Sequence, residues 1–213
     1  MRFFPKSFAD QRYIDWEHTY KWESHKLFNE LLNREEFQTL LRRGDFLQIA
    51  NRALQVESKT KPPFLFSFEK MALRDALRTP QAAKLFSEGL FNLLYQSGPL
   101  PNRFIAWIMS VAELPRKQSR VLSWPILTFF PFIAQPSKHM ILKPTAMRSA
   151  ALELGYDLDY SAKPTFKTYQ SLLQFADLVK AEIIDLKPKD YHDVQTFLWV
   201  IGSAEYEALE HEL

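Results

Sequence analysis

Apolar residues recur at helical spacing along most of this chain, and that pattern limits its fold more than any other feature. Between residues 10 and 32, for example, Tyr13, Trp16, Tyr20, Leu27 and Leu31 fall on one stripe. Such a stripe has to be buried against another apolar surface, so a chain that repeats it folds as packed helices. The sequence therefore predicts a mainly α-helical protein.

Prolines, glycines and capping residues divide this pattern into separate helices. Gly44 is suited to end one helix and Asp45 to begin the next, while Thr79 and Pro80 are a typical cap and first helical residue. Only five of the 213 residues are glycine and 15% are aromatic, which favours helices over a turn-rich β fold. We predict about eight or nine helices, at residues 10–32, 37–44, 45–54, 67–78, 79–94, 102–114, 145–155, 164–183 and 190–202.

One stretch departs from the helical pattern. Residues 121–134 are rich in Ile, Leu, Phe and Trp, but they include Pro125 and Pro131, which lack the N–H that a helix interior or a central strand uses. Residues 135–138 are a candidate turn, and residues 139–143 are a candidate extended return. We therefore predict a small β-hairpin-like insertion at 121–143, covered by the helices around it.

Charge is distributed unevenly along the chain. The formal net charge is +2, but residues 203–213 contain Glu205, Glu207, Glu210 and Glu212 and no Lys or Arg. Removing these four from the 25 acidic residues leaves 21 against 27 basic ones, a net charge of +6 for residues 1–202. We predict a single helix-rich domain at 1–202 and an acidic tail at 203–213. The tail is either a solvated end or a cover for the basic surface, and the basic body suits an anionic partner.

Several classes of protein are excluded by what the sequence lacks. Without cysteine, the chain has no disulfide, no thiolate metal site and no cysteine nucleophile. It has no glycine-rich phosphate loop and no zinc-binding or serine-hydrolase motif, so we expect no cofactor and no resident metal. No run approaches the ~18 apolar residues of a membrane span, and the first residues lack the core of a signal peptide. We expect a cytoplasmic protein with no membrane partner, and whether it is an enzyme stays open.

Residues 114–152 are the clearest candidate for a working surface. They include six basic residues and five prolines but no acidic residue. Basic side chains attract phosphate, and aromatic rings between them can stack on bases. The leading hypothesis is a non-catalytic binding or adaptor protein for an anionic partner, nucleic acid foremost, and the alternative is that the aromatic residues belong to the core. The candidate binding residues are Arg116, Lys117, Arg120, Trp124, Lys138, His139, Lys143 and Arg148.

A second hypothesis is a metal-dependent nuclease or phosphoesterase. Asp185 and Lys187 follow an apolar run as Asp-Leu-Lys, and Asp157 and Asp159 lie upstream. In such enzymes carboxylates hold a divalent cation and a lysine stabilises the charge that develops during the reaction. The helical spacing that runs through Ile183 argues against this site, because the chemistry is typically built on a strand.

A third hypothesis is a protein–protein interaction module. The aromatic-rich residues 121–143 would then provide an exposed apolar contact surface. Such a module would associate with itself or a partner in solution, and a monomer at high concentration in light scattering would count against it.

Three segments resemble parts of a known family: FEKMALRDAL at 68–77, SWPILTFFPFIAQPSKHMILKP at 123–144 and KPKDYHDVQTFLWVIGS at 187–203. The family is an uncharacterised bacterial one of about this length, and the resemblance spans most of the chain. It implies a bacterial cytoplasmic protein. It implies no activity, cofactor or functional residue.

The nucleic-acid hypothesis makes a direct prediction. Replacing Arg116, Lys117 and Arg120 with Glu should weaken binding to single- or double-stranded nucleic acid and leave the thermal midpoint almost unchanged, because exposed charges contribute little to stability. Fluorescence anisotropy with a labelled oligonucleotide, titrated at several salt concentrations, measures this. Absence of any salt-dependent binding at low ionic strength would refute the hypothesis.

Overall fold

The protein is mainly α-helical, as predicted. A computed structural model describes residues 3–206, and within that range it has eleven α-helices and no strand. A π-helical turn (Ile14–His18) joins the first two helices, and short 3₁₀ turns cover Ser7–Ala9 and Ile184–Leu186. The helices are α1 (Gln11–Tyr13), α2 (Thr19–Leu32), α3 (Arg34–Arg43), α4 (Phe46–Lys59), α5 (Ser67–Ala76), α6 (Pro80–Tyr95), α7 (Leu100–Ala112), α8 (Trp124–Ala134), α9 (Pro144–Glu153), α10 (Phe166–Glu182) and α11 (Tyr191–Gly202).

Every predicted helical region contains a helix, and the local signals behind several predictions are visible. Gly44 ends α3 with a left-handed φ of 76°. The side chain of Thr79 accepts a hydrogen bond from the N–H of Ala82, and that of Asp190 accepts one from the N–H of His192. The predicted count of eight or nine helices is too low for two reasons: the π turn divides the first region, and α8 forms where no helix was expected.

The predicted β-hairpin at 121–143 is wrong. Residues 124–134 form α8, and residues 135–143 continue as a turn and an extended segment that pairs with no strand in the part of the chain the structure describes. Ser123 caps α8 by accepting a hydrogen bond from the N–H of Ile126 at 3.4 Å. Pro125 lies in the first turn, where a helix needs no N–H donor. The first proline therefore supports the helix instead of excluding it.

Pro131 lies inside α8 and leaves the carbonyl of Leu127 without its usual partner four residues on. The indole Nε1–H of Trp107, on α7, donates to that carbonyl at 2.9 Å. Because both residues are fully buried, no water can substitute for this bond. A neighbouring helix thus supplies the hydrogen bond that the proline removes, and α8 can be buried on every side.

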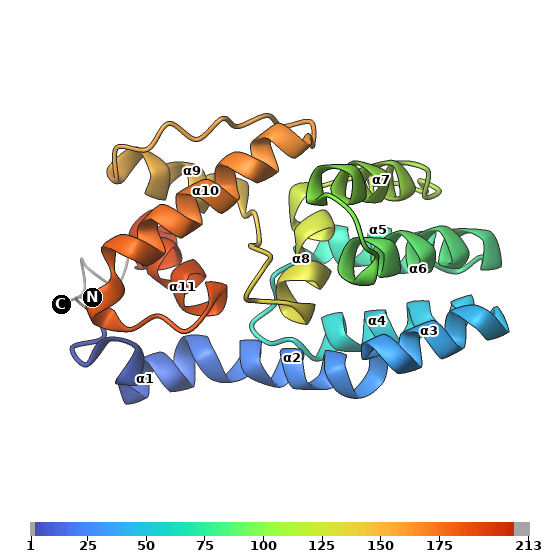
Figure 1. Ribbon diagram of the computed structural model, residues 1–213, viewed down its shortest axis with the longest axis horizontal. Helices are drawn as coiled ribbons and strands as arrows, with labels where there is room; N and C mark the ends of the chain where they lie inside the picture. Colours follow the sequence, from blue (N-terminus) through green and yellow to red (C-terminus); the bar gives the residue numbers. More distant parts are fainter. Residues whose placement is uncertain (1–2, 207–213) are drawn as a thin grey trace.

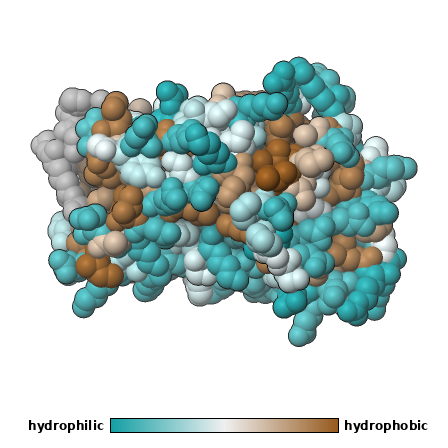
Figure 2. Space-filling model, turned by 45° about the horizontal axis from the view of Figure 1, so that its top comes forward, coloured by the Kyte–Doolittle hydropathy of each residue, from teal (hydrophilic) through white to brown (hydrophobic). Residues whose placement is uncertain are grey.

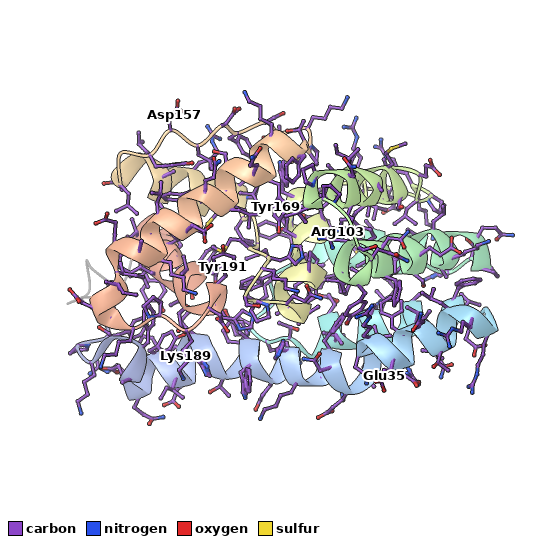
Figure 3. The ribbon with its side chains drawn as sticks, viewed as in Figure 1. Glu35, Arg103, Asp157, Tyr169, Lys189 and Tyr191 are labelled. Atoms are coloured by element: carbon purple, nitrogen blue, oxygen red, sulfur yellow. The ribbon has the colours of Figure 1, made fainter. Side chains whose placement is uncertain are left out.

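Residues 135–143, the extended segment, run through the centre of the molecule between α8 and α10 (Figure 1). The N–H of Leu142 donates to Thr128 on α8 at 3.0 Å, and the N–H of Tyr191 on α11 donates to the carbonyl of Pro136 at 2.9 Å. His139 lies 2.9 Å from the hydroxyl of Tyr169, which extends from α10 towards this centre (Figure 3). These bonds replace the partner strand that a hairpin would have given.

Figure 1 shows α3 to α8 on one side of the extended segment and α9 to α11 on the other, with α1 and α2 along one edge. Helices α9 and α11 touch at their backbones: a Cβ on Gly202 would lie 2.0 Å from the carbonyl oxygen of Ala146. Only glycine fits there. The end of α11 is therefore fixed against the start of α9, immediately after the extended segment.

The main core takes buried residues from α2 through α11. A second, smaller cluster joins the two ends of the described chain, because Phe3, Phe4 and Tyr13 pack around Tyr206.

Residues 207–213, with three of the four glutamates of the predicted tail, lie outside the described range. Between residues 3 and 206 no helix combines the length and the apolar character that a membrane crossing requires. On the face shown in Figure 2, hydrophilic side chains divide the apolar surface into separate patches.

The role of Trp107 can be tested with a matched pair of variants. Trp107→Phe leaves the buried Leu127 carbonyl unsatisfied, at a cost of about 1–3 kcal/mol. Trp124→Phe removes the same atoms from another buried tryptophan, but its acceptor is the carbonyl of the partly exposed Ser161, which water can reach. We expect Trp107→Phe to lower the free energy of unfolding in urea by at least about 1 kcal/mol more than Trp124→Phe. Equal losses would contradict the role given to Pro131.

Candidate ligand-binding site

The eight residues of the predicted basic face do not share one surface. Trp124, His139 and Lys143 are buried. The other five are exposed: Arg116, Lys117, Arg120, Lys138 and Arg148. Nucleic-acid binding stays a prediction, and it rests on these five exposed residues alone.

The exposed basic residues also have local partners. Lys117 lies 3.9 Å from a carboxylate oxygen of Asp75, and the guanidinium of Arg148 lies 4.9 Å from the ring centre of Tyr160. Arg116, Lys117 and Arg120 belong to the loop after α7, whereas Arg148 belongs to α9. These two elements lie in different parts of the molecule (Figure 1). The aromatic residues between them lie in α8, whose residues are all buried. They are core, so the contact surface that the protein–protein hypothesis placed there is not exposed.

The four residues proposed for a nuclease site are not brought together. Tyr156 stacks on Phe175, which places Asp157 beside the middle of α10, whereas Asp185 lies beyond the end of that helix. The seven-residue separation between Phe175 and Glu182, where α10 ends, already corresponds to about 10 Å of helix. Figure 3 shows the same separation, with Asp157 at the outer edge and Lys189, two residues after Lys187, far from it. Asp159 pairs instead with Lys167. Within residues 3–206, no three acidic or histidine side chains are grouped so that they could hold a metal ion.

The structure shows a different site, where α11 ends beside the first helices. One pocket, of about 180 Å³, lies among the π turn, residues 62–64 and α11, and its lining includes Glu17, Lys143 and Gln195. A second pocket, of about 260 Å³, lies between α9, α11 and Phe66. The two pockets share Lys143, Trp199 and Glu205, so they meet at these side chains. We call the two pockets together the Lys143 cleft.

Lys143 is the last residue of the extended segment, directly before α9, and its backbone is held by the packing of that segment. Its side chain is buried, with 9% of the residue exposed. The ammonium donates to the carbonyl of Phe64 at 2.6 Å and lies 4.4 Å from the ring centre of Phe66. No carboxylate oxygen lies within 4.0 Å of it among the residues described. Burial lowers the pKa of Lys143, and the negative charge of Glu69 opposes this shift only in part.

Two polar side chains of the cleft are buried without a hydrogen-bond partner among residues 3–206. They are the Oε1 atom of Gln195, a residue that lines the first pocket, and the hydroxyl of Ser203, a residue that lines the second. Gln195 is 2% exposed and Ser203 is 7% exposed. Buried polar groups are nearly always paired, so two unpaired ones beside a buried ammonium are typical of a site that binds a polar ligand.

Glu17 forms a fixed wall of the cleft. It lies in the π turn, a distortion frequently found at functional sites, and its side chain is buried. One oxygen accepts from the ammonium of Lys21 at 3.0 Å, and the other accepts from the hydroxyl of Tyr206 at 2.9 Å. Lys21 also donates to Thr196 at 2.6 Å. Burial, helped by the charge of Glu17, raises the pKa of Tyr206, which therefore stays a neutral donor.

Comparisons with known proteins add nothing to this geometry, because no family model, curated protein or solved structure matches the chain. The resemblance to a bacterial family stays a prediction. Of the cleft residues, only Lys143 was predicted from the sequence as a site residue, and it was expected on an open surface. The one available signal was its position at the end of the apolar run Met140-Ile141-Leu142, which predicts burial of the segment that contains it.

His139, another residue of the predicted basic face, is structural. It is 2% exposed, and burial, reinforced by the positive charges of Arg103 and Lys138, lowers its pKa to about 3. Arg103 and Tyr169 lie near each other at this centre (Figure 3). The folded protein therefore keeps His139 neutral at pH values where an unfolded chain protonates it.

This difference predicts a loss of stability in acid. Because the folded pKa is lower than the unfolded value of about 6.5, the contribution of His139 is complete above pH ~6.5 and is lost as the pH falls towards 3. Between pH 6.5 and 5 the loss amounts to about 2 kcal/mol. His139→Gln should flatten the pH dependence of the free energy of unfolding by that amount, as measured by urea denaturation at both pH values. An unchanged slope would show that His139 is protonated in the fold.

Proposed function

We propose that the protein is a non-catalytic binding protein that holds a small carboxylate-containing molecule in the Lys143 cleft. The observation that carries this proposal is the buried ammonium of Lys143, which faces two pockets and has no carboxylate partner among the described residues. A buried charge is costly unless it is paired. A ligand carboxylate would supply the missing charge, while the Phe64 carbonyl holds the ammonium in position.

The size of the cleft supports a small ligand. Its two pockets, of about 180 and 260 Å³, together reach the lower part of the range of roughly 300–1,000 Å³ that ligand sites occupy. Lys143 is too deeply buried to contact the backbone of a nucleic acid, which binds to exposed charges. The small-molecule site and the nucleic-acid hypothesis therefore depend on different residues.

The groups around Lys143 support binding more than catalysis. Both oxygens of Glu17 already accept hydrogen bonds, from Lys21 and Tyr206, so this carboxylate is committed to fixed partners. The remaining lining is largely aromatic, with Trp16, Tyr20 and Trp199 around the first pocket. Such walls bury an apolar ligand body while a few polar groups orient it.

Substitution of one lysine tests this function. A set of aromatic and aliphatic carboxylates and amino acids, screened by ligand-observed NMR, should contain compounds whose affinity falls about 10–100-fold in Lys143→Met, because a charge-assisted hydrogen bond contributes about 1.5–3 kcal/mol. Titrations followed by tryptophan fluorescence give the affinities, since Trp199 lines both pockets. Lys138→Met is the matched control: it removes an exposed lysine of the same segment and should bind as the unaltered protein does.

Two results would refute the proposal. One is the absence of any carboxylate or amino acid that binds, and the other is binding that Lys143→Met leaves unchanged. The triple variant of Arg116, Lys117 and Arg120 to Glu separates the hypotheses, because it should affect nucleic-acid binding and leave the cleft unaltered.

A further inference from the structure

We infer that the ligand of the Lys143 cleft is a zwitterion with a large apolar side chain, an α-amino acid such as phenylalanine. This inference rests on the proposed function and adds the chemical class of the ligand. Its basis is the division of the cleft into an acceptor-rich pocket, an apolar pocket and one ammonium between them.

The first pocket is suited to an ammonium group. Among the described residues of its lining, Lys143 is the only basic one, whereas Glu17 and Glu205 are both acidic. Gln195 also lines this pocket, and its Oε1, an acceptor, has no partner among the described residues. One oxygen of Glu205 accepts from the indole of Trp199 at 3.3 Å, and the other has no hydrogen-bond partner within residues 3–206. An ammonium donates hydrogen bonds and accepts none, so these oxygens match it.

Lys143 is suited to the carboxylate of the same molecule. Its ammonium has three donors, and the Phe64 carbonyl takes one of them. The unpaired hydroxyl of Ser203 lines the second pocket, which Lys143 also lines, and it can donate to a carboxylate oxygen there. The ligand's two charged groups would thus lie near the junction of the pockets, as they do in an α-amino acid, where both are bonded to the α-carbon.

The second pocket is suited to an apolar side chain. Phe66, Trp199 and Pro144 line it, together with the small residues Ala146 and Ala204. Its charged residues, Lys143 and Glu205, are the two that it shares with the first pocket. At about 260 Å³ this pocket has room for an aromatic or large aliphatic group, whose burial there favours binding.

Ligands that lack one of these three parts leave part of the cleft unsatisfied. A simple carboxylate places no donor on Gln195, and a simple amine places no charge on Lys143. An inorganic anion leaves the apolar pocket empty. A site with buried polar groups discriminates strongly against a molecule that leaves them unpaired.

An analogue series on the unaltered protein tests the inference by isothermal titration calorimetry. L-phenylalanine should bind at least about 10-fold more tightly than 3-phenylpropionate, which lacks the ammonium, than phenethylamine, which lacks the carboxylate, and than L-alanine, which lacks the ring. Lys143→Met should reduce the affinity for phenylalanine to that for phenethylamine. Gln195→Leu should close the gap between phenylalanine and 3-phenylpropionate. The series on the unaltered protein decides the question even if a variant fails to fold.

The outcomes separate this inference from the function on which it rests. Equal affinity for phenylalanine and 3-phenylpropionate, with both lost in Lys143→Met, would overturn the zwitterion and support carboxylate binding. Equal affinity for phenylalanine and alanine would overturn the apolar side chain. If no compound of the series or of the wider carboxylate set binds in a way that depends on Lys143, the proposed function fails and this inference fails with it.

Discussion

The hydrogen bond from the Trp107 indole to the Leu127 carbonyl determines the centre of this molecule. It satisfies the carbonyl that Pro131 leaves without a partner, so a helix that is apolar on all sides can be buried completely. The chain leaving that helix then stays in the interior as the extended segment, bonded to α8 through Thr128 and to α11 through Pro136. Lys143 comes at the end of this segment, and its side chain is buried with it.

The helices could be predicted from the sequence because their signals are local. Gly44 takes a left-handed conformation and Thr79 caps α6, as the identity of each residue suggests. The α8 region could not be predicted in the same way. A proline's missing N–H excludes a helix interior only when nothing else satisfies the free carbonyl, and here the donor is on a different helix. The hairpin prediction failed because the helix depends on a tertiary contact, and the helix-breaking tendency of proline takes no account of tertiary contacts.

The candidate site was less predictable than the fold. Lys143 was recognised as a basic residue, but its burial comes from Phe64, Phe66 and Trp199, which are distant in sequence. Glu17 falls within the predicted helix at residues 10–32, whose apolar stripe looks regular. Nothing in that stripe indicates a π turn. Gln195 and Ser203 are ordinary polar residues of α11 and its C-cap. They become distinctive only once their neighbours leave them without partners.

The contrast between two buried lysines points to function more directly than either does alone. Lys21 is fully buried, and the fold gives it Glu17 at 3.0 Å and Thr196 at 2.6 Å. Lys143 has a backbone carbonyl and an aromatic ring. The same protein therefore gives one buried ammonium a carboxylate and a hydroxyl as partners. Among the described residues the other has no carboxylate oxygen within 4.0 Å, and its residue lines two pockets. A charge kept in that condition destabilises the free protein, and a ligand that neutralises it is favoured by the free energy that pairing recovers.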